Sequence, residues 1–394
     1  MDDLEPQDSQ RNVFEERVSE RVNRVPPSGI RRFFELAEEL DDVISLGVGE
    51  PDFSAPWSAR QAAIESLELG KTSYTTNRGR SELRELISRK LERYGLSYRG
   101  EDEILVTTGV SEGLDLAFRA LLDPGQKAAV PDPSYVSYVP GVVFADGEPV
   151  AVETSSEEEF KLRYSDLEQA GAADCELLLL CYPNNPTGAV MREDDLEEVA
   201  EFVRENDLLV LSDEVYADLT YEGGHCSIAT LEGMRERTVV FNGFSKAYAM
   251  TGMRLGYAAG PPEVIGAMNK IHQYSMLSSP ITSQFAAIDA LEWCEDEVVE
   301  MRRKYDRRRR FVLSRLDELG IDCFESKGAF YVFPECPHGS EEEFAEKLLE
   351  AEGVAVVPGD VFGPAGEGHL RLSYATGMEE LKEAFRRIER FLEG

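Results

Sequence analysis

The stretch TVVFNGFSKAYAMTGMRLGY, residues 238–257, joins an apolar run to a single lysine. The run Thr238–Phe241 is typical of a strand that is buried on both faces. Lys246 follows it, among aromatic side chains such as Phe244 and Tyr248. Burial in such surroundings disfavours the ammonium form and lowers the pKa, and a lysine of lowered pKa is the amine that Schiff-base chemistry requires. The stretch alone is also compatible with a surface lysine on a loop.

Five more apolar runs precede this one and alternate with helical patterns. They are Glu103–Val106, Lys127–Val130, Pro149–Val152, Glu176–Cys181 and Leu208–Leu211. The alternation predicts an α/β fold with a mainly parallel central sheet and helices on both faces. Polar, glycine-rich sequence follows several of these runs, with Asn185 after one and Asp213 after another. Because open α/β sheets bind ligands at the carboxyl ends of their strands, we expect the functional site at that edge.

The residues at this edge indicate a particular cofactor. Thr108–Ser111 opens a predicted helix, and the amides at a helix N-terminus form an anion site to which Arg254 can add a second charge. Asp213 is a carboxylate in a buried position, which requires a cationic partner. In pyridoxal phosphate the aldehyde bonds a lysine, the ring nitrogen needs a carboxylate, and the phosphate needs a helix end and an arginine. The set around Lys246 therefore describes a pyridoxal phosphate site.

The sequence resembles the class I/II aminotransferases of the fold-type I pyridoxal phosphate enzymes, and within them the archaeal and thermophilic aspartate and aromatic branch. The resemblance runs from about residue 20 to the end of the chain. It is carried by five motifs in order, Tyr182–Gly188, Ser212–Tyr216, the stretch around Lys246, Gly328–Pro334 and Arg371–Ala375. It implies a mainly parallel sheet with a smaller α+β domain beside it.

The resemblance also implies catalytic roles. Lys246 would form the Schiff base and move the substrate proton, and Asp213 would pair with the ring nitrogen. Tyr216 and Asn185 would bond the ring oxygen. Arg371 would clamp the substrate α-carboxylate in the two-pronged way that only arginine offers, helped by Asn185 and the backbone at Gly49.

The remaining cofactor contacts implied by the resemblance lie around the ring face and the phosphate. Tyr135 would stack on the ring. The phosphate would be held by Val110, Ser111, Ser245 and Arg254. Tyr74 would reach the phosphate bound in the neighbouring subunit, which makes the functional unit a homodimer.

Four departures from the family pattern leave the donor open. Gly243 replaces a frequent serine three residues before the lysine, and Met253 replaces a frequent tryptophan. Ser111 stands where some thermophilic aspartate enzymes have a lysine, and no arginine occurs between Arg254 and Arg302. The leading donors are therefore aspartate and aromatic amino acids, then alanine, with 2-oxoglutarate as the expected acceptor.

Three alternatives share the fold. A β-elimination lyase or a cyclopropane-forming synthase would differ in its product. A cofactor-binding regulator is disfavoured because only some twenty residues precede the family region.

The run Arg307–Arg310 could indicate nucleic-acid binding. Because it lies in a helical pattern of an acidic chain, it is expected instead to pair with nearby carboxylates.

Composition limits the partners. Asp and Glu number 76 against 41 Lys and Arg, a formal net charge of −35, which repels nucleic acid and anionic membranes. The acids are spread along the chain, so we favour adaptation to a salt-rich cytoplasm over a basic partner.

The apolar runs are too short for a membrane span, and the acidic N-terminus does not resemble a secretory signal. Six scattered cysteines indicate reduced thiols, and the dispersed histidines give no metal site.

A chain of 394 residues exceeds what one hydrophobic core usually serves. We expect an acidic N-terminal extension over residues 1–20 and a large cofactor-binding domain over 46–292. Residues 21–45 and 293–394 are expected to form the small domain, with a short strand pair near 321–325 and 329–333.

Overall fold

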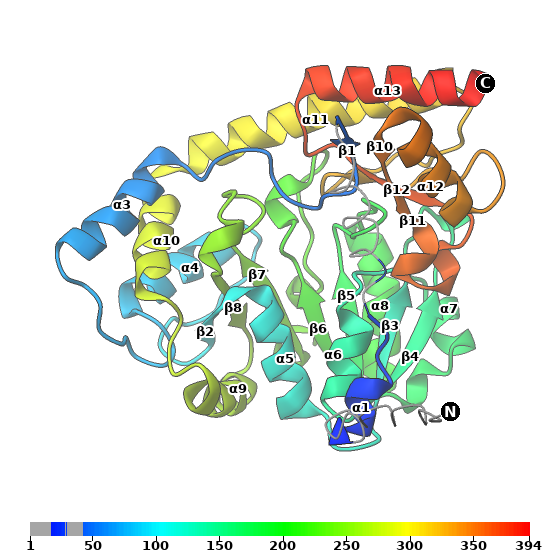
Figure 1. Ribbon diagram of the computed structural model, residues 1–394. Coiled ribbons are helices and arrows are strands. Elements are labelled where there is room, and N and C mark those ends of the chain that lie inside the picture. Colours follow the sequence, from blue (N-terminus) through cyan, green and yellow to red (C-terminus); the bar gives the residue numbers. More distant parts are fainter. Residues whose placement is uncertain (1–16, 28, 30–41) are drawn as a thin grey trace, which may run out of the picture.

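The computed structural model describes residues 17–27, 29 and 42–394, and a seven-stranded sheet lies at its centre (Figure 1). Its strands, in spatial order, are β2 (Ile104–Thr107), β8 (Gly256–Ala259), β7 (Thr238–Gly243), β6 (Leu209–Asp213), β5 (Leu177–Cys181), β3 (Lys127–Asp132) and β4 (Glu148–Glu153). Only β8 runs antiparallel to its neighbours, β2 and β7. The predicted α/β fold with a mainly parallel sheet is confirmed, and all six expected strands belong to it. The sequence analysis missed β8, whose glycine and two alanines give a weak strand signal.

Helices cover both faces of this sheet, because side chains alternate along each buried strand. One face packs against α5 (Gly109–Leu121), α6 (Tyr138–Phe144) and α9 (Pro262–Ser275). The other packs against α7 (Tyr164–Gln169) and α8 (Glu193–Glu205) at one end, and against α4 (Ser81–Glu92) and α10 (Ile281–Trp293) at the other. α3 (Trp57–Glu68) lies along α10, and the short α1 (Glu20–Asn23) lies near α6.

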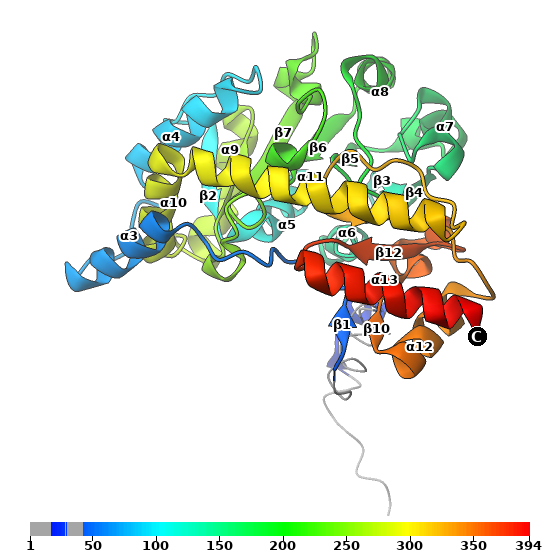
Figure 2. The same cartoon turned by 90° about the horizontal axis from the view of Figure 1, so that it is seen from above.

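A second, smaller assembly lies beside the sheet, and α11 (Glu295–Glu318) leads into it (Figure 2). It contains an antiparallel sheet of β11 (Val357–Pro358), β12 (Leu370–Ser373) and β9 (Tyr331–Val332). It also contains β10 (Val354–Ala355), α12 (Glu341–Glu352) and α13 (Met378–Glu393). β1 (Ile44–Ser45) pairs in parallel with β10, so residues near the N-terminus join the C-terminal part.

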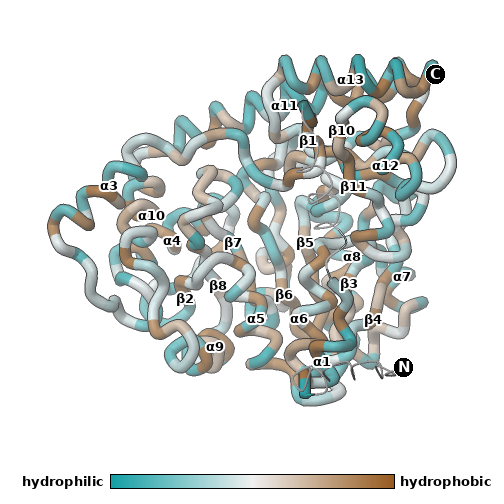
Figure 3. The backbone as a smooth tube through the Cα atoms, viewed as in Figure 1, coloured by the Kyte–Doolittle hydropathy of each residue, from teal (hydrophilic) through white to brown (hydrophobic). Residues whose placement is uncertain are grey.

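Helix α13 shows how this smaller assembly is held together. Its polar and apolar residues alternate along the helix (Figure 3). Leu381, Ala384, Phe385 and Ile388 are buried, at the spacing of one apolar helix face. They pack into the same core as residues of α11 and α12.

Two local expectations turned out differently. A strand was expected near 321–325, but residues 321–327 form none, and their backbone bonds instead to Gly188 and Glu335. The arginine run does pair with carboxylates, as expected, although two of its members are buried rather than on the surface. Arg308 binds Asp52 through both guanidinium nitrogens at 2.7 and 2.8 Å, and Arg309 is buried among several carboxylates.

The sheet register brings the polar strand ends together. Cys181 of β5 lies opposite Asp213 of β6, and Asp213 lies opposite Phe241 of β7. The loops that follow these strands carry Asn185, Tyr216 and Lys246, and they meet at one edge of the sheet.

Candidate active site

A cavity of about 680 Å³ lies at the carboxyl ends of β5, β6 and β7. Eleven of the residues singled out from the sequence line it: Gly49, Val110, Ser111, Tyr135, Asn185, Asp213, Tyr216, Ser245, Lys246, Arg254 and Arg371. They come from both the central sheet and the smaller assembly. The cavity therefore gathers residues that lie more than 300 positions apart in the sequence.

Lys246 lies in the cavity wall with its ammonium enclosed by protein. Its Nζ donates a hydrogen bond of 2.6 Å to the carbonyl oxygen of Gly49. The Nζ atom also lies 5.7 Å from the ring centre of Tyr216 and 5.6 Å from that of Phe330. Burial and the nearby Arg371 charge lower the pKa of Lys246 to about 8, although Glu50 and Asp213 oppose the shift. Near neutral pH this lysine is therefore a neutral, nucleophilic amine far more often than an ordinary lysine is.

Asp213 is a buried carboxylate at the end of β6. Its Oδ2 accepts a hydrogen bond of 2.8 Å from the hydroxyl of Tyr138, and its Oδ1 accepts one of 3.2 Å from the amide of Val215. Burial raises the pKa of Asp213 to about 6 in spite of these hydrogen bonds. Within the described part of the chain, no ion pair neutralises it. The site therefore suits a ligand that brings a positive charge to this carboxylate.

Arg371, on β12, is buried with part of its guanidinium unpaired. Nη1 donates to Asn185 Oδ1 at 2.9 Å, and Nη2 donates to the carbonyl of Gly47 at 2.6 Å. The rings of Tyr331 and Phe362 lie on either side, each centred 4.6 Å from the guanidinium carbon. Nε is buried and has no hydrogen-bond partner among the described residues. Burial lowers the pKa of Arg371, and a buried arginine that pairs with no carboxylate of the described residues is prepared for an anion.

A second anion site lies at the start of α5. Gly109 has φ +77°, and a side chain there would come within 2.6 Å of Arg254 Nη2. The guanidinium of Arg254 therefore lies directly against the first turn of α5, which contributes Val110 and Ser111 to the cavity. Backbone amides of a helix N-terminus together with an arginine fork suit a phosphate group.

The glycine at position 243 has a structural reason. A Cβ atom there would lie 3.0 Å from Gly256 Cα and 3.0 Å from the carbonyl oxygen of Leu255, because β7 and β8 pair closely at this point. A serine would require these strands to move apart. The close pairing of β7 and β8 therefore accounts for a glycine at this position.

Two tyrosines that line the cavity were missed by sequence reasoning. Tyr138 is the donor to Asp213, and Tyr331 bonds the hydroxyl of Tyr216 at 3.0 Å. A Cβ atom on Gly49 would meet the Tyr331 hydroxyl, so a larger residue here would require the Tyr331 ring to move. Tyr138 lies three residues after Tyr135, and Tyr331 lies inside the motif Gly328–Pro334. This closeness to predicted site residues is the feature of the sequence that could have identified them.

Tyr74 lies outside the cavity and is 80 % exposed. Its loop is tied to the rest of the chain by Gln284, whose Nε2 donates to Thr75 Oγ1 at 3.1 Å. Asn77 Nδ2 also donates to the carbonyl of Leu277 at 2.6 Å. Tyr74 is thus held away from the cavity of its own chain.

The arrangement fits pyridoxal phosphate. It offers an amine of lowered pKa, an unneutralised buried carboxylate, and a helix N-terminus with an arginine, together with a separate anion site at Arg371. No group of histidine, cysteine or acidic side chains suited to a metal ion occurs among residues 17–27, 29 and 42–394. Over the same residues, no helix has the length and apolarity needed to cross a membrane.

Comparison with known proteins gives one consistent family. The chain matches the family described as aminotransferase class I and II over residues 41–388. It is 44 % identical to the aspartate aminotransferase of Pyrococcus abyssi and 43 % identical to the aromatic-amino-acid aminotransferase 2 of Thermococcus litoralis; each match covers 95 % of this chain and 98 % of the relative. Its structure resembles that of the Thermus thermophilus aspartate aminotransferase with maleate, with a TM-score of 0.89, 41 % identity, and coverage of 95 % and 99 % of the two chains.

Proposed function

The chain belongs to the class I and II aminotransferases, and from this premise we propose that the 680 Å³ cavity is its active site. The protein is a pyridoxal phosphate-dependent enzyme that exchanges an amino group between an amino acid and a 2-oxo acid. The main support for this site is that Lys246, Asp213 and Arg371 all line one cavity. Lys246 is an amine of lowered pKa, Asp213 is a buried carboxylate that a cationic ligand would neutralise, and Arg371 is a buried cation that suits an anion.

Lys246 and Asp213 have different roles, which follow from their surroundings in the cavity. When bound, pyridoxal phosphate withdraws electrons from the substrate α-carbon and so makes its proton removable. Lys246 Nζ accepts that proton, because its lowered pKa leaves a neutral amine available. Asp213 holds a positive charge at the ring nitrogen.

Binding and orientation come from the other residues of the cavity. Arg371 binds the α-carboxylate through guanidinium N–H groups that are not used for Asn185 and Gly47, and Asn185 orients the guanidinium. Tyr216 and Asn185 would bond the ring oxygen, and Tyr135 would stack on the ring. Val110, Ser111, Ser245 and Arg254 hold the phosphate, and the carbonyl of Gly49 orients Lys246.

For the substrates, we propose an aspartate or aromatic donor and 2-oxoglutarate as acceptor, in line with the names of the relatives. The cations that line the cavity in the described chain are Lys246, Arg254 and Arg371, and each already has a role. No further cation of the described chain remains for a second carboxylate, and Glu50 adds a negative charge at the rim. An aromatic donor is therefore favoured over aspartate, and 2-oxoglutarate, which is itself a dicarboxylate, would need a cation from a second subunit for its distal carboxylate.

The function is tested by single-turnover reactions of the holoenzyme with individual L-amino acids. We expect loss of the cofactor–lysine absorbance together with formation of the matching 2-oxo acid. Lys246→Ala should abolish turnover, whereas Lys270→Ala on the exposed face of α9 should not. Normal turnover in Lys246→Ala, or release of pyruvate and a thiol instead of a transaminated pair, would contradict the proposal.

We further propose a homodimer in which Tyr74 completes the phosphate site of the neighbouring subunit. Large apolar side chains are exposed around its loop and on α3; they are Ile64, Leu67, Leu69, Tyr74, Tyr274, Met276 and Leu277. Such a concentration of exposed apolar area marks an interaction surface. Tyr74→Phe should weaken cofactor binding several-fold while sedimentation still shows a dimer, and a monomeric wild-type protein would refute this arrangement.

For the architecture, we propose a large domain of residues 46–292, a small domain of 21–45 and 293–394, and an acidic extension of 1–20. The pairing of β1 with β10 supports the discontinuous small domain. The bond from Arg371 to Asn185 supports substrate binding where the two domains meet. Residues 1–16, 28 and 30–41 lie outside the described residues, so the proposal rests on the remainder.

For the environment, we propose a salt-rich cytoplasm. The net charge of −35 creates self-repulsion that dissolved ions screen, and thiols such as the buried Cys181 suit a reducing compartment. The unfolding temperature should rise with KCl concentration up to the molar range. Full stability at low salt would remove the proposal of a salt-rich environment.

A further inference from the structure

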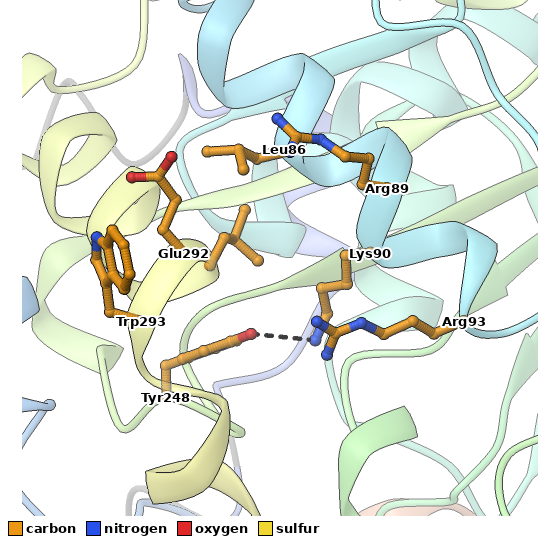
Figure 4. Close-up of a pocket in the computed structure, with 8 residues that line it drawn as sticks. Leu86, Arg89, Lys90, Arg93, Tyr248, Glu292 and Trp293 are labelled. Atoms are coloured by element: carbon orange, nitrogen blue, oxygen red, sulfur yellow. Dashed lines mark hydrogen bonds between the residues drawn. The ribbon is translucent and has the colours of Figure 1, made fainter.

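A buried ion pair lies behind the segment that carries Lys246. Lys90 Nζ, on α4, is 2.6 Å from Asp218 Oδ2, and the two side chains are only 4 % and 15 % exposed. Asp218 also accepts a hydrogen bond from the hydroxyl of Tyr94. Lys90 Nζ donates a further hydrogen bond, at 3.3 Å, to the hydroxyl of Tyr248 (Figure 4). One ammonium group therefore joins three segments of the chain.

The positions of its partners connect this ammonium to the cavity. Asp218 lies two residues after Tyr216, in a short helical turn, and Tyr248 lies two residues after Lys246. Both partners are held by further contacts: the ring of Tyr248 packs 5.5 Å from Phe244, and Asp218 holds Tyr94. Lys90 thus bridges the segment that presents Tyr216 and the segment that presents Lys246.

The pair is charged in spite of its burial. Burial opposes the charge on Lys90, but the Asp218 carboxylate overcomes this and raises the pKa of Lys90 well above its ordinary value. Burial likewise opposes the charge on Asp218, yet Lys90 lowers its pKa. Buried ion pairs contribute little net stability compared with apolar residues of the same size, so stability alone is a weak reason for this one. The geometry of the pair suggests another role, because its directional hydrogen bonds fix the segment that carries Tyr216 relative to the segment that carries Lys246.

We propose that Lys90 and Asp218 are positioning residues for transamination, which set the placement of Tyr216 relative to Lys246. The inference rests on the proposed active site. It assigns the pair no contact with the cofactor or the substrate: Lys90 acts through Tyr248 on the lysine segment, and Asp218 acts through the turn that follows Tyr216.

The surroundings of the pair allow a clean test. A separate cavity of about 300 Å³ opens onto Lys90 and Tyr248 between α4 and the end of α10 (Figure 4). It shares no lining residue with the 680 Å³ cavity. Arg89 is exposed, lies on the same helix and lines the same small cavity, which makes Arg89→Met a matched control.

The main variant is Lys90→Met combined with Asp218→Leu. Removing both charges avoids an unpaired buried ion, and such replacements are often neutral for stability. The holoenzyme is titrated with pH while the absorbance of the cofactor bound to Lys246 is followed, and kcat is expressed per bound cofactor. Both readouts are independent of any unfolded fraction. If Tyr216 is displaced in the double variant, the midpoint of this absorbance titration should rise by at least half a pH unit. The value of kcat per bound cofactor should fall at least tenfold.

The outcomes separate the alternatives. A shifted midpoint with an unfolding temperature close to that of the wild type and of Arg89→Met supports positioning. A midpoint and a kcat equal to those of Arg89→Met overturn it. If the double variant does not fold, Asp218→Asn keeps the shape of the side chain, and an unshifted midpoint in that variant overturns the inference equally. A wild type that binds the cofactor but does not transaminate would remove the proposed function while leaving the spectroscopic comparison intact.

Discussion

Replacing Arg371 with lysine tests how the substrate carboxylate is bound. The wild-type guanidinium donates one N–H of Nη1 to Asn185 and one N–H of Nη2 to Gly47, and among the described residues its second Nη N–H groups have no hydrogen-bond acceptor. Lysine keeps the positive charge but offers a point donor instead of a fork, so it cannot bond a carboxylate and orient against Asn185 in the same way.

The size of the effect follows from the lost hydrogen bonds. A hydrogen bond to a charged group contributes about 1.5–3 kcal/mol. Losing one such bond to the α-carboxylate should lower kcat/KM by about 10- to 150-fold, because 1.4 kcal/mol corresponds to a factor of ten. The α-carboxylate does not change during the reaction, so Arg371 binds the ground state and the transition state alike. We therefore expect most of the loss in KM rather than in kcat.

The assay compares an L-amino acid with its α-amide in both enzymes. The wild type should prefer the acid strongly, and in Arg371→Lys this preference should shrink by the same factor by which kcat/KM falls. Arg119→Lys serves as a control, because Arg119 is exposed on α5 and its ion-pair partner among the described residues is the nearby Asp115. A loss below about threefold, or an equal loss for acid and amide, would refute carboxylate binding by Arg371.

Three further results are expected. Asp213→Asn removes the buried partner of a cationic ring nitrogen, and the loss of such a pair, about 2–5 kcal/mol, should lower kcat at least 30-fold; an unchanged kcat would contradict this role. Gly109→Ala would place a Cβ atom 2.6 Å from Arg254 Nη2 on a residue whose φ is +77°. The Kd for the cofactor, measured by equilibrium dialysis, should therefore rise roughly tenfold. An unchanged Kd would argue against this anion site. Uptake of pyridoxal phosphate by the cofactor-free protein needs neutral Lys246, whose pKa is lowered to about 8. The uptake rate should therefore rise with pH through about 8 and level off above it, whereas an ordinary lysine would still show a rising rate near pH 10.

The strands and the motif order were accessible from the sequence, because their signals are local. Apolar runs of four to six residues mark buried strands, and glycine-rich polar sequence marks the loops that follow them. This was sufficient to place Lys246, Asp213 and Asn185 at one edge of the sheet. It failed for β8 and for residues 321–327, where the local pattern is weak or where backbone partners lie in distant loops.

The contacts that give these residues their chemistry were not accessible in this way. The sequence alone was sufficient to predict the family and the cofactor and to propose Lys246 as the reactive lysine, because each depends on residue types at short spacing. The tertiary structure decided that Tyr138 bonds Asp213, that Gly49 bonds Lys246 and that Lys90 bonds Asp218, across 75, 197 and 128 positions. Burial and distant charges set the lowered pKa of Lys246 and the raised pKa of Asp213, and both arise only when remote segments fold together.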